Sequence, residues 1–502
     1  MSLYLYGAGG ALLVALYSYV AQRPRSKLPL PPGPRKWPLV GNLFDMPATF
    51  EWITYMEWSK KYNSDVLHLN VAGTSIIILS SAEAANELLE KRAGVYSDRA
   101  RLPMVNELMG WDFALGDNWR AHRRLFHEVF NLVAAQSFRP KEREVCHELL
   151  YDILQRPDHD VLDHLRHMAA KIVLSVAYGI DVLPSNDPYV ELAENAVDGL
   201  VTAIVPGRFL VDSIPLLKYV PAWFPGAGFQ RQAAEWRRLS QGMRERPFAE
   251  ATQKIALGNA PHSFTQDGLR MAEAAGANKA REEELVKNVA GTMYTAGTGT
   301  TVSALGTFIL AMLANPEAQK KAQAEIDVVV GQDRLPDFED EASLPYVTAL
   351  MKESMRWRNV TPIAIPHFLP VEDEYQGYRL PAGSIVIPNT WYTMYPDPYS
   401  FKPERYLLDG KPNPAVTDPD IVFGFGRRIC PGRHMAHSSV WITLVSILAT
   451  FDISKAVDEN GQIIEPKYDY FAGLVVMPLS FKCSIKPRSE KARALIEASV
   501  KK

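Results

Sequence analysis

Apolar positions recur with two different periods along the chain. Short runs rich in β-branched residues predict strands, at Val66–Val71, Ser75–Leu79, Ser384–Pro388 and Leu474–Ile485. Longer runs with helical spacing dominate, and the longest extends from Glu283 to Ala314 and stops at Asn315-Pro316. Because this segment is apolar over most of its circumference from Val302 onward, we expect it to cross the core.

The balance of these patterns predicts a mainly α-helical fold with small β-sheets at one side (α+β). Residues 41–502 contain no repeat, no low-complexity linker and no long block of charge, so we expect one large globular domain. Two stretches look loop-like, residues 256–282 and the proline-containing segment Asp409–Asp420.

The middle of the long helix has an unusual composition. Residues 296–301 read AGTGTT, and both glycine and β-branched threonine are poor helix formers. Two interpretations are open: a local widening where another group packs or bonds to the backbone, or a tolerated weak spot in a buried helix.

The N-terminus predicts a membrane anchor. Residues 1–22 carry no charge and are almost all apolar or small, and about 20 helical residues span a bilayer core of roughly 30 Å. Basic residues and a cluster of prolines follow in residues 23–40, which indicates a stiff stalk and a body on the cytosolic side. A cleaved signal peptide is the alternative, but it would carry basic residues before the apolar run.

Composition narrows the class of protein. The chain of 502 residues has 54 basic and 57 acidic residues, a net charge of −3, which argues against nucleic-acid binding. A hydrophobic fraction of 47% is enough for a large core. The three cysteines, Cys146, Cys430 and Cys483, are too few for a disulfide scaffold.

One segment carries a chemical signature. Residues 423–432, FGFGRRICPG, fit the pattern F-x-x-G-x-R-x-C-x-G, which begins at Phe423 and ends at Gly432. The glycines permit a tight loop that approaches a flat cofactor, and Arg428 supplies positive charge for a carboxylate. Cys430 lies just before an apolar helix, Ala436–Phe451, whose N-terminus favours an anion.

These features point to a metal-binding thiolate at Cys430. No partner cysteine or histidine stands at zinc spacing, whereas a single thiolate suits haem iron. The alternative is a free buried cysteine in a turn, and it is the better interpretation for Cys146 and Cys483.

With these residues the chain resembles the cytochrome P450 family, membrane-anchored haem-thiolate monooxygenases of the microsomal type, most closely those of filamentous and wood-rotting fungi. The resemblance covers essentially the whole chain. It implies haem b with Cys430 as the axial ligand, and electrons from NADPH delivered by a separate NADPH-cytochrome P450 reductase. It also implies a single-pass protein of the endoplasmic reticulum with its catalytic domain in the cytosol.

Further motifs agree with the resemblance. Residues 353–356 match E-x-x-R, and the family joins this pair to an arginine of a later P-E-R segment, so Glu353, Arg356 and Arg405 are expected to form a buried structural network. Residues 119–123 match W-x-x-x-R, which the family uses to hold a haem propionate through Trp119 and Arg123. The resemblance implies a similar contact for His367.

The long helix both matches the family and departs from it. Thr300, followed by Thr301, occupies the position whose hydroxyl faces dioxygen, but Gly299 stands where the family has an acid that relays protons. A placed proton-transfer group typically contributes about 10²–10⁴-fold to a rate. The chain is also a few residues shorter than the family pattern before Trp119 and between Trp391 and Tyr395, through a deletion or a gene-model error.

The implied reaction inserts one atom of O2 into a lipophilic small molecule such as a terpenoid, a steroid or a polycyclic aromatic, in secondary or xenobiotic metabolism. The family places the following residues around the substrate, although plain core packing explains each singly as well: Leu108, Phe209, Ala296, Ile363, Ala364, Phe471 and Leu474. Basic residues near the cysteine loop indicate a face for an acidic reductase or simply solvated charge, namely Arg120, Arg124, Arg427, Arg428 and Arg433.

Two other functions remain as alternatives. Gly299 suggests a haem-thiolate peroxygenase, isomerase or dehydratase that does not use the usual dioxygen cycle. The shortened stretches suggest a degenerate, non-enzymatic haem protein.

Overall fold

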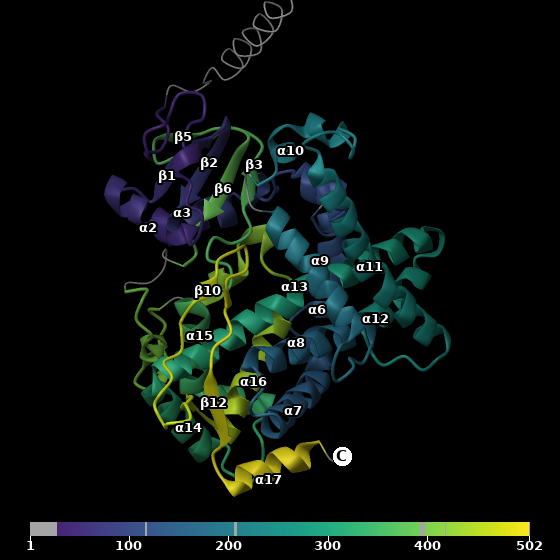
Figure 1. Cartoon of the computed structure of the whole chain (residues 1–502), viewed down its shortest axis with the longest axis vertical. Coiled ribbons are helices and arrows are strands. Elements are labelled where there is room, and N and C mark those ends of the chain that lie inside the picture. Colours follow the sequence, from purple (N-terminus) through teal and green to yellow (C-terminus); the bar gives the residue numbers. More distant parts are fainter. Residues whose placement is uncertain (1–27, 116–117, 205–207, 392–396, 417, 501–502) are drawn as a thin grey trace, which may run out of the picture.

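The computed structural model describes residues 28–115, 118–204, 208–391, 397–416 and 418–500. Helices form most of the body, and a small sheet lies at one end of it beside α2 and α3 (Figure 1). The expected mainly α-helical architecture with small sheets is therefore confirmed. The predicted anchor, residues 1–22, lies outside the described residues.

The main sheet has the strand order β1-β2-β6-β3 and comprises β1 (Val66–Val71), β2 (Thr74–Leu79), β6 (Ser384–Pro388) and β3 (His367–Leu369). Neighbours β1 and β2 form an antiparallel hairpin, β2 and β6 run parallel, and β6 and β3 run antiparallel. Side chains alternate between the faces, as strand geometry requires: Ile77 and Leu79 enter one apolar cluster, Ile76 and Ile78 another.

Smaller pairs of strands lie elsewhere: β4 (Asp373–Tyr375) with β5 (Tyr378–Leu380), β7 (Leu407–Leu408) with β8 (Lys411–Pro412), β9 (Phe451–Lys455) with β12 (Cys483–Pro487), and β10 (Tyr470–Phe471) with β11 (Met477–Pro478). The single strand predicted over Leu474–Ile485 is therefore wrong. The chain divides it between two hairpins, because Pro478 ends the pairing of β11 before Cys483 begins that of β12.

The principal helices, of which α13 is the longest, are α2 (Glu51–Tyr62), α3 (Ala82–Ala85), α6 (Trp119–Phe130), α7 (Arg139–Gln155), α8 (Val161–Tyr178), α9 (Pro188–Ala203), α10 (Leu210–Ser213), α11 (Gly228–Ala256), α12 (Phe264–Ala274), α13 (Lys279–Ala314), α14 (Pro316–Val329), α15 (Pro345–Trp357), α16 (Arg433–Thr450) and α17 (Glu490–Ser499). The prediction of a loop over 256–282 is wrong at its centre. There α12 buries Phe264 and Ala272, with a Ser263 side chain that caps its first turn.

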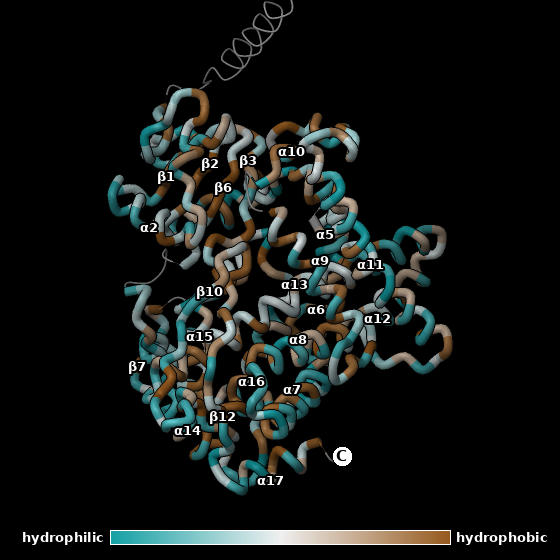
Figure 2. The backbone as a smooth tube through the Cα atoms, viewed as in Figure 1, coloured by the Kyte–Doolittle hydropathy of each residue, from teal (hydrophilic) through white to brown (hydrophobic). Residues whose placement is uncertain are grey.

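Helix α13 crosses the interior, as its composition predicts, and begins at Lys279 rather than Glu283. From Val302 to Leu313 its side chains are buried, and in Figure 2 the helix lies deep within the chain. Among the described residues it is the one helix apolar and long enough to span a membrane, but its apolar part is mostly buried, as in a soluble core. It remains α-helical through residues 296–301, where Ala296 is exposed and residues 297–300 are partly buried.

The described part of the predicted stalk lies on the sheet. The carbonyl oxygen of Pro32 accepts a hydrogen bond of 2.9 Å from the amide of His68, and that of Pro29 accepts one of 2.8 Å from Arg379. These bonds attach residues 28–40 to the body of the protein.

Candidate functional site

The Cys430 loop lies between two short 3₁₀ turns and helix α16. The turns cover Pro419–Phe423 and Gly426–Arg428. The amide of Cys430 donates a 2.7 Å hydrogen bond to the carbonyl oxygen of Phe423, which closes the loop on itself. Gly426 has a φ of 54°, and a Cβ there would overlap the carbonyl oxygen of Leu89, so the sequence pattern requires glycine at this position.

The sulfur of Cys430 lies in a mixed environment. Burial raises the pKa of its thiol, while a hydrogen bond from the Gly432 amide and the charges of Arg123 and Arg433 lower it. Because α16 begins at Arg433, its N-terminal pole also faces the sulfur. The Gly432 amide, the two arginines and the N-terminus of α16 all favour the thiolate, which is the form that binds metal.

Three arginines converge beside this loop. Arg123, on α6, donates a hydrogen bond to the carbonyl oxygen of Ile429, and Arg428 donates one of 2.7 Å from Nε to that of Ser97. Arg99 donates from Nη1 to the carbonyl oxygens of Ile365 (2.5 Å) and Pro366 (2.7 Å).

These arginines have few negative neighbours. Burial, then the positive charges of Arg428 and Arg123, lower the pKa of Arg99 to about 9. Burial likewise lowers the pKa of Arg428 to about 10, against the opposing influence of Asp98. Within the described residues, no carboxylate forms an ion pair with any of the three. We call Arg99, Arg123 and Arg428 the open cluster.

The two other residues expected at a propionate lie beside the open cluster. Trp119 is 9% exposed, and the guanidinium carbon of Arg428 lies 3.9 Å from the centre of its ring. His367 is buried, and its Nδ1 lies 2.6 Å from the carbonyl oxygen of Tyr96. Burial and the nearby Arg99 lower the pKa of His367 to about 3, so its ring is neutral at pH 7 and adds no positive charge.

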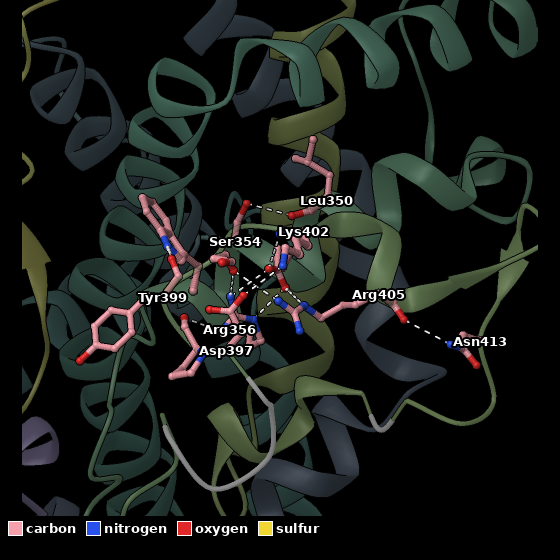
Figure 3. Close-up of polar contacts among 12 residues, drawn as sticks. Leu350, Ser354, Arg356, Asp397, Tyr399, Lys402, Arg405 and Asn413 are labelled. Carbon is pink, nitrogen blue, oxygen red and sulfur yellow. Dashed lines mark hydrogen bonds and ion pairs between the residues drawn. The ribbon is translucent and has the colours of Figure 1, made fainter. Parts of the chain in front are cut away.

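A second charged cluster has the opposite character. Glu353, fully buried on α15, accepts bonds of 2.8 and 2.9 Å from Arg356 and lies 3.0 Å from Nε of Arg405. It also accepts a 2.6 Å bond from the amide of Lys402. Figure 3 shows the two guanidinium groups turned toward the same carboxylate. We call Glu353, Arg356 and Arg405 the closed cluster.

The closed cluster also holds the chain that follows α15. Arg356 donates to the carbonyl oxygens of Pro398 (2.9 Å) and Ser400 (2.8 Å), and the indole of Trp357 donates to that of Tyr399 (2.8 Å). Its charges and donors thus have partners within the chain, which is typical of a structural element.

The threonines of α13 bond back to their own helix. Thr300 Oγ1 donates a 2.8 Å bond to the carbonyl oxygen of Ala296, and Thr301 Oγ1 donates one of 2.8 Å to that of Gly297. A Cβ at Gly299 would lie 3.7 Å from the methyl carbon of Met477, so crowding at that atom does not exclude a side chain there.

The expected pocket residues come from separate elements. Leu108 ends a π-helical turn, Phe209 precedes α10, Ala296 lies on α13, and Phe471 belongs to β10. Hydrogen bonds join three of the segments: Ser303 of α13 donates to the carbonyl oxygen of Val476, whose amide donates a 2.8 Å bond to that of Val360. The segment beyond Val360 carries Ile363 and Ala364, and Leu474 lies just before Val476.

Sequence reasoning missed two residues of the site. Arg99 belongs to no motif, and only the fold brings it to Arg123 and Arg428. Glu90 accepts a 2.6 Å hydrogen bond from the amide of Gly426 and so supports the cysteine loop from another segment. No local signal marks either of them. The shortened stretches include residues 116–117 and 392–396, which lie outside the described residues.

Comparisons with known proteins agree with this geometry. The family model described as Cytochrome P450 matches residues 31–484. The chain is 47% identical to Cytochrome P450 monooxygenase 98 of Postia placenta, over 97% of this chain and 96% of that protein. It is 46% identical to Cytochrome P450 monooxygenase ple1 of Rhodocybe pseudopiperita, over 97% and 94%.

A further relative is named for its substrate. The Tryptamine 4-monooxygenase of Psilocybe cyanescens is 40% identical over 92% of this chain and 94% of its own length. The family match spans nearly the whole described body, and relatives of this similarity are named monooxygenases. The chain therefore belongs to the cytochrome P450 family and is an enzyme of its fungal monooxygenase group.

Proposed function

We propose that this protein inserts one atom of O2 into a lipophilic small molecule, with haem b held by Cys430 and electrons supplied from NADPH through a separate reductase. The observation that carries the proposal is the pairing of a thiol at a helix N-terminus with three arginines that form no ion pair with a carboxylate of the described residues. A thiolate-bound haem supplies the activation of dioxygen.

The described residues fit such a group. Cys430 would hold the haem iron through its sulfur, to which the amide of Gly432 donates. Haem b carries two carboxylates, and the open cluster supplies three guanidinium groups that can bind them. Arg123, Arg428 and Trp119 are the residues expected from the sequence, and we add Arg99. Neutral His367 orders the backbone at Tyr96 rather than supplying charge.

Thr300 and Thr301 are the hydroxyl groups that we assign to proton handling. Because each hydroxyl hydrogen is used in a bond to its own helix, the oxygen is left to accept from water. With glycine at 299, the chain itself provides no carboxylate at this point. We therefore assign proton delivery to water held by Thr300, and we expect slower turnover than in an enzyme with an acid at position 299.

The substrate proposal rests on the apolar character of the residues that the sequence predicts for the pocket with Ala296. Leu108, Phe209, Ile363, Ala364, Phe471 and Leu474 are apolar, which favours a lipophilic molecule such as a terpenoid, steroid or polycyclic aromatic. The name of one relative, Tryptamine 4-monooxygenase, supports an aromatic amine as a further substrate class.

We propose that one end of the protein lies against a membrane, with residues 1–22 as a single-pass anchor in the endoplasmic reticulum and 23–40 as its connection to the catalytic domain, 41–502. Exposed apolar side chains support this: Leu39 (98%), Phe44 (77%), Leu210 (70%), Leu216 (75%) and Trp223 (79%). The segment before β1 and helix α10 lie toward the same end of the molecule (Figure 1). Large exposed apolar patches are typical of membrane or partner contacts.

The decisive test is the carbon-monoxide difference spectrum of the reduced protein beside Cys430→Ala. A band near 450 nm in the parent that is lost in the variant is expected for a thiolate-bound haem. A band near 420 nm in the parent would favour the degenerate haem protein, and no haem at all would contradict the proposal.

A peroxygenase, isomerase or dehydratase is the second candidate, and Gly299 is the observation that favours it. Product formed with hydrogen peroxide as readily as with NADPH and reductase would support that function. We expect the opposite: turnover with reductase, and an increase in it when Gly299→Asp supplies the missing carboxylate.

A further inference from the structure

A buried carboxyl group lies between α7 and α16, outside the site described above. Glu142 of α7 has no exposed surface. Both of its carboxyl oxygens lie 2.8 Å from Ser438 Oγ, and Oε1 lies 2.5 Å from Ser439 Oγ. Both serines belong to α16, the helix that begins directly after the Cys430 loop.

The hydrogen bonds satisfy Glu142 in either protonation state. Ser438 Oγ also lies 3.0 Å from the carbonyl oxygen of Met435. When Glu142 is ionised, both serines donate to it. When it is protonated, its O–H donates to Ser438, and Ser438 in turn donates to Met435 in the first turn of α16. The proton therefore decides whether the Ser438 hydrogen binds Glu142 of α7 or the carbonyl oxygen of Met435 in α16.

Few charges face this carboxyl group. Burial raises the pKa of Glu142 to about 7, and the hydrogen bonds from Ser439 and Ser438 and the charge of Arg139 oppose that shift. Other charged groups nearby are already paired: Arg143 of α7 with Asp337, and His437 of α16 with Glu341. His434 of α16 has a pKa below its usual value through burial.

One helix connects the carboxyl group to the cysteine loop. Ser438 follows Cys430 by eight residues, and the last six of these, from Arg433, belong to α16. A change in charge beside this helix acts on the field at its N-terminus, because the protein interior screens charges less than water does. A negative charge beside the second turn of α16 opposes the positive pole that this helix directs at Cys430.

We propose that Glu142 is a positioning residue for the Cys430 ligand, which it serves by holding the first turns of α16 in one of two hydrogen-bonded states. The inference rests on the proposed function, because it takes Cys430 as the ligand of the haem iron. It gives the enzyme a sensitivity to pH that comes from outside the haem pocket.

The direction in which pH shifts the haem midpoint potential follows from the negative charge of ionised Glu142. Ionised Glu142 disfavours the additional negative charge that reduction brings, so the haem midpoint potential falls as pH rises through about 7. Burial of the carboxylate also costs stability. A carboxyl group with a raised pKa contributes its stability at low pH and loses it as pH rises toward and through that value.

The test is spectroelectrochemical titration of the holoenzyme between pH 6 and 8. In Glu142→Gln we expect a potential equal to that of the parent at pH 6 and higher than that of the parent at pH 8. Thermal unfolding should show the variant more stable than the parent at pH 8. Cys146→Ala is the matched control, since Cys146 is buried one turn further along α7 and contacts Ile442 of α16 without charge.

Ser439→Ala gives an independent test if Glu142→Gln does not fold. It removes one donor to the carboxylate, so the midpoint of the potential's pH dependence should move to higher pH. A parent and a Glu142→Gln variant with the same pH dependence and an intact 450 nm band would overturn this inference alone. A parent without that band would overturn the proposed function as well.

Discussion

The closed and open clusters use the same chemistry for opposite purposes. In the closed cluster, two arginines share the carboxylate of Glu353, and the remaining donors bind carbonyl oxygens. In the open cluster, Arg428 and Arg123 lower the pKa of Arg99, Arg123 lowers that of Arg428, and no carboxylate of the described residues forms an ion pair with any of the three. The charges of the closed cluster have partners within the chain, whereas we propose that those of the open cluster take a negative group from a ligand.

We propose that this difference separates structural from binding arginines. A buried cation costs free energy unless it is paired, so several buried arginines without an ion pair among the described residues favour a site for a negatively charged ligand. The motif E-x-x-R marks the closed cluster and W-x-x-x-R marks the open one. The motifs alone do not show which of these arginines are paired within the chain, and they do not include Arg99.

The largest change in stability is expected when the only carboxylate of the closed cluster, Glu353, is removed. Glu353→Gln leaves Arg356 and Arg405 without compensation in the interior, which typically costs about 3–5 kcal/mol. Urea unfolding followed by circular dichroism measures the loss in haem-free protein. Glu317→Gln, in an exposed pair with Lys320, is the control and should change stability by less than about 1 kcal/mol. Equal stability of Glu353→Gln and the parent would contradict the structural role.

Removal of an open-cluster arginine should not destabilise the haem-free protein, in contrast to the removal of Glu353. Arg123→Gln relieves repulsion, so the haem-free form is expected to unfold no earlier than the parent. Its haem affinity should fall by roughly 10- to 100-fold, because a hydrogen bond to a charged group contributes about 1.5–3 kcal/mol. Haem titration measures this, with the exposed neighbour Arg124→Gln as control. A loss of stability without loss of haem affinity would place Arg123 with the closed cluster.

A free polyanion should distinguish the clusters without mutation. Pyrophosphate at fivefold excess over its dissociation constant would stabilise the haem-free protein by about 1 kcal/mol. Thermal unfolding should show this increase in the parent and in Arg124→Gln, and a smaller one in Arg99→Gln. The same increase in Arg99→Gln would argue that Arg99 lies outside the binding set.

The smallest effect concerns the loop that carries Arg428. Glu90→Gln weakens the bond from the amide of Gly426, and loss of such a bond typically costs about 0.5–1.5 kcal/mol. We expect slightly faster haem release, measured by transfer to apomyoglobin, and a loss of stability in the haem-free protein of no more than about 1.5 kcal/mol. Glu87→Gln, on the same turn and paired with Lys91, provides the comparison. Identical release rates in the two variants would remove Glu90 from the site.

Much of the fold follows from local pattern. The strands at Val66–Val71 and Ser384–Pro388 occur with the predicted bounds, because β-branched runs between turn residues have few alternatives. The helix ending at Ala314 is equally clear, since Asn315-Pro316 cannot continue it. Helix α12 was missed because its apolar residues are few, and burial against α13 rather than local propensity stabilises it.

The sequence by itself determined the cysteine loop, the E-x-x-R and W-x-x-x-R pairs, and the absence of an acid at Gly299, since each depends on neighbours within ten residues. Tertiary structure alone decided that Arg99 joins Arg123 and Arg428, that Glu90 supports Gly426, and that Glu142 meets Ser438. These contacts join residues far apart in the chain. Folding removes these charged groups from water, and a charge that is buried in this way requires a partner.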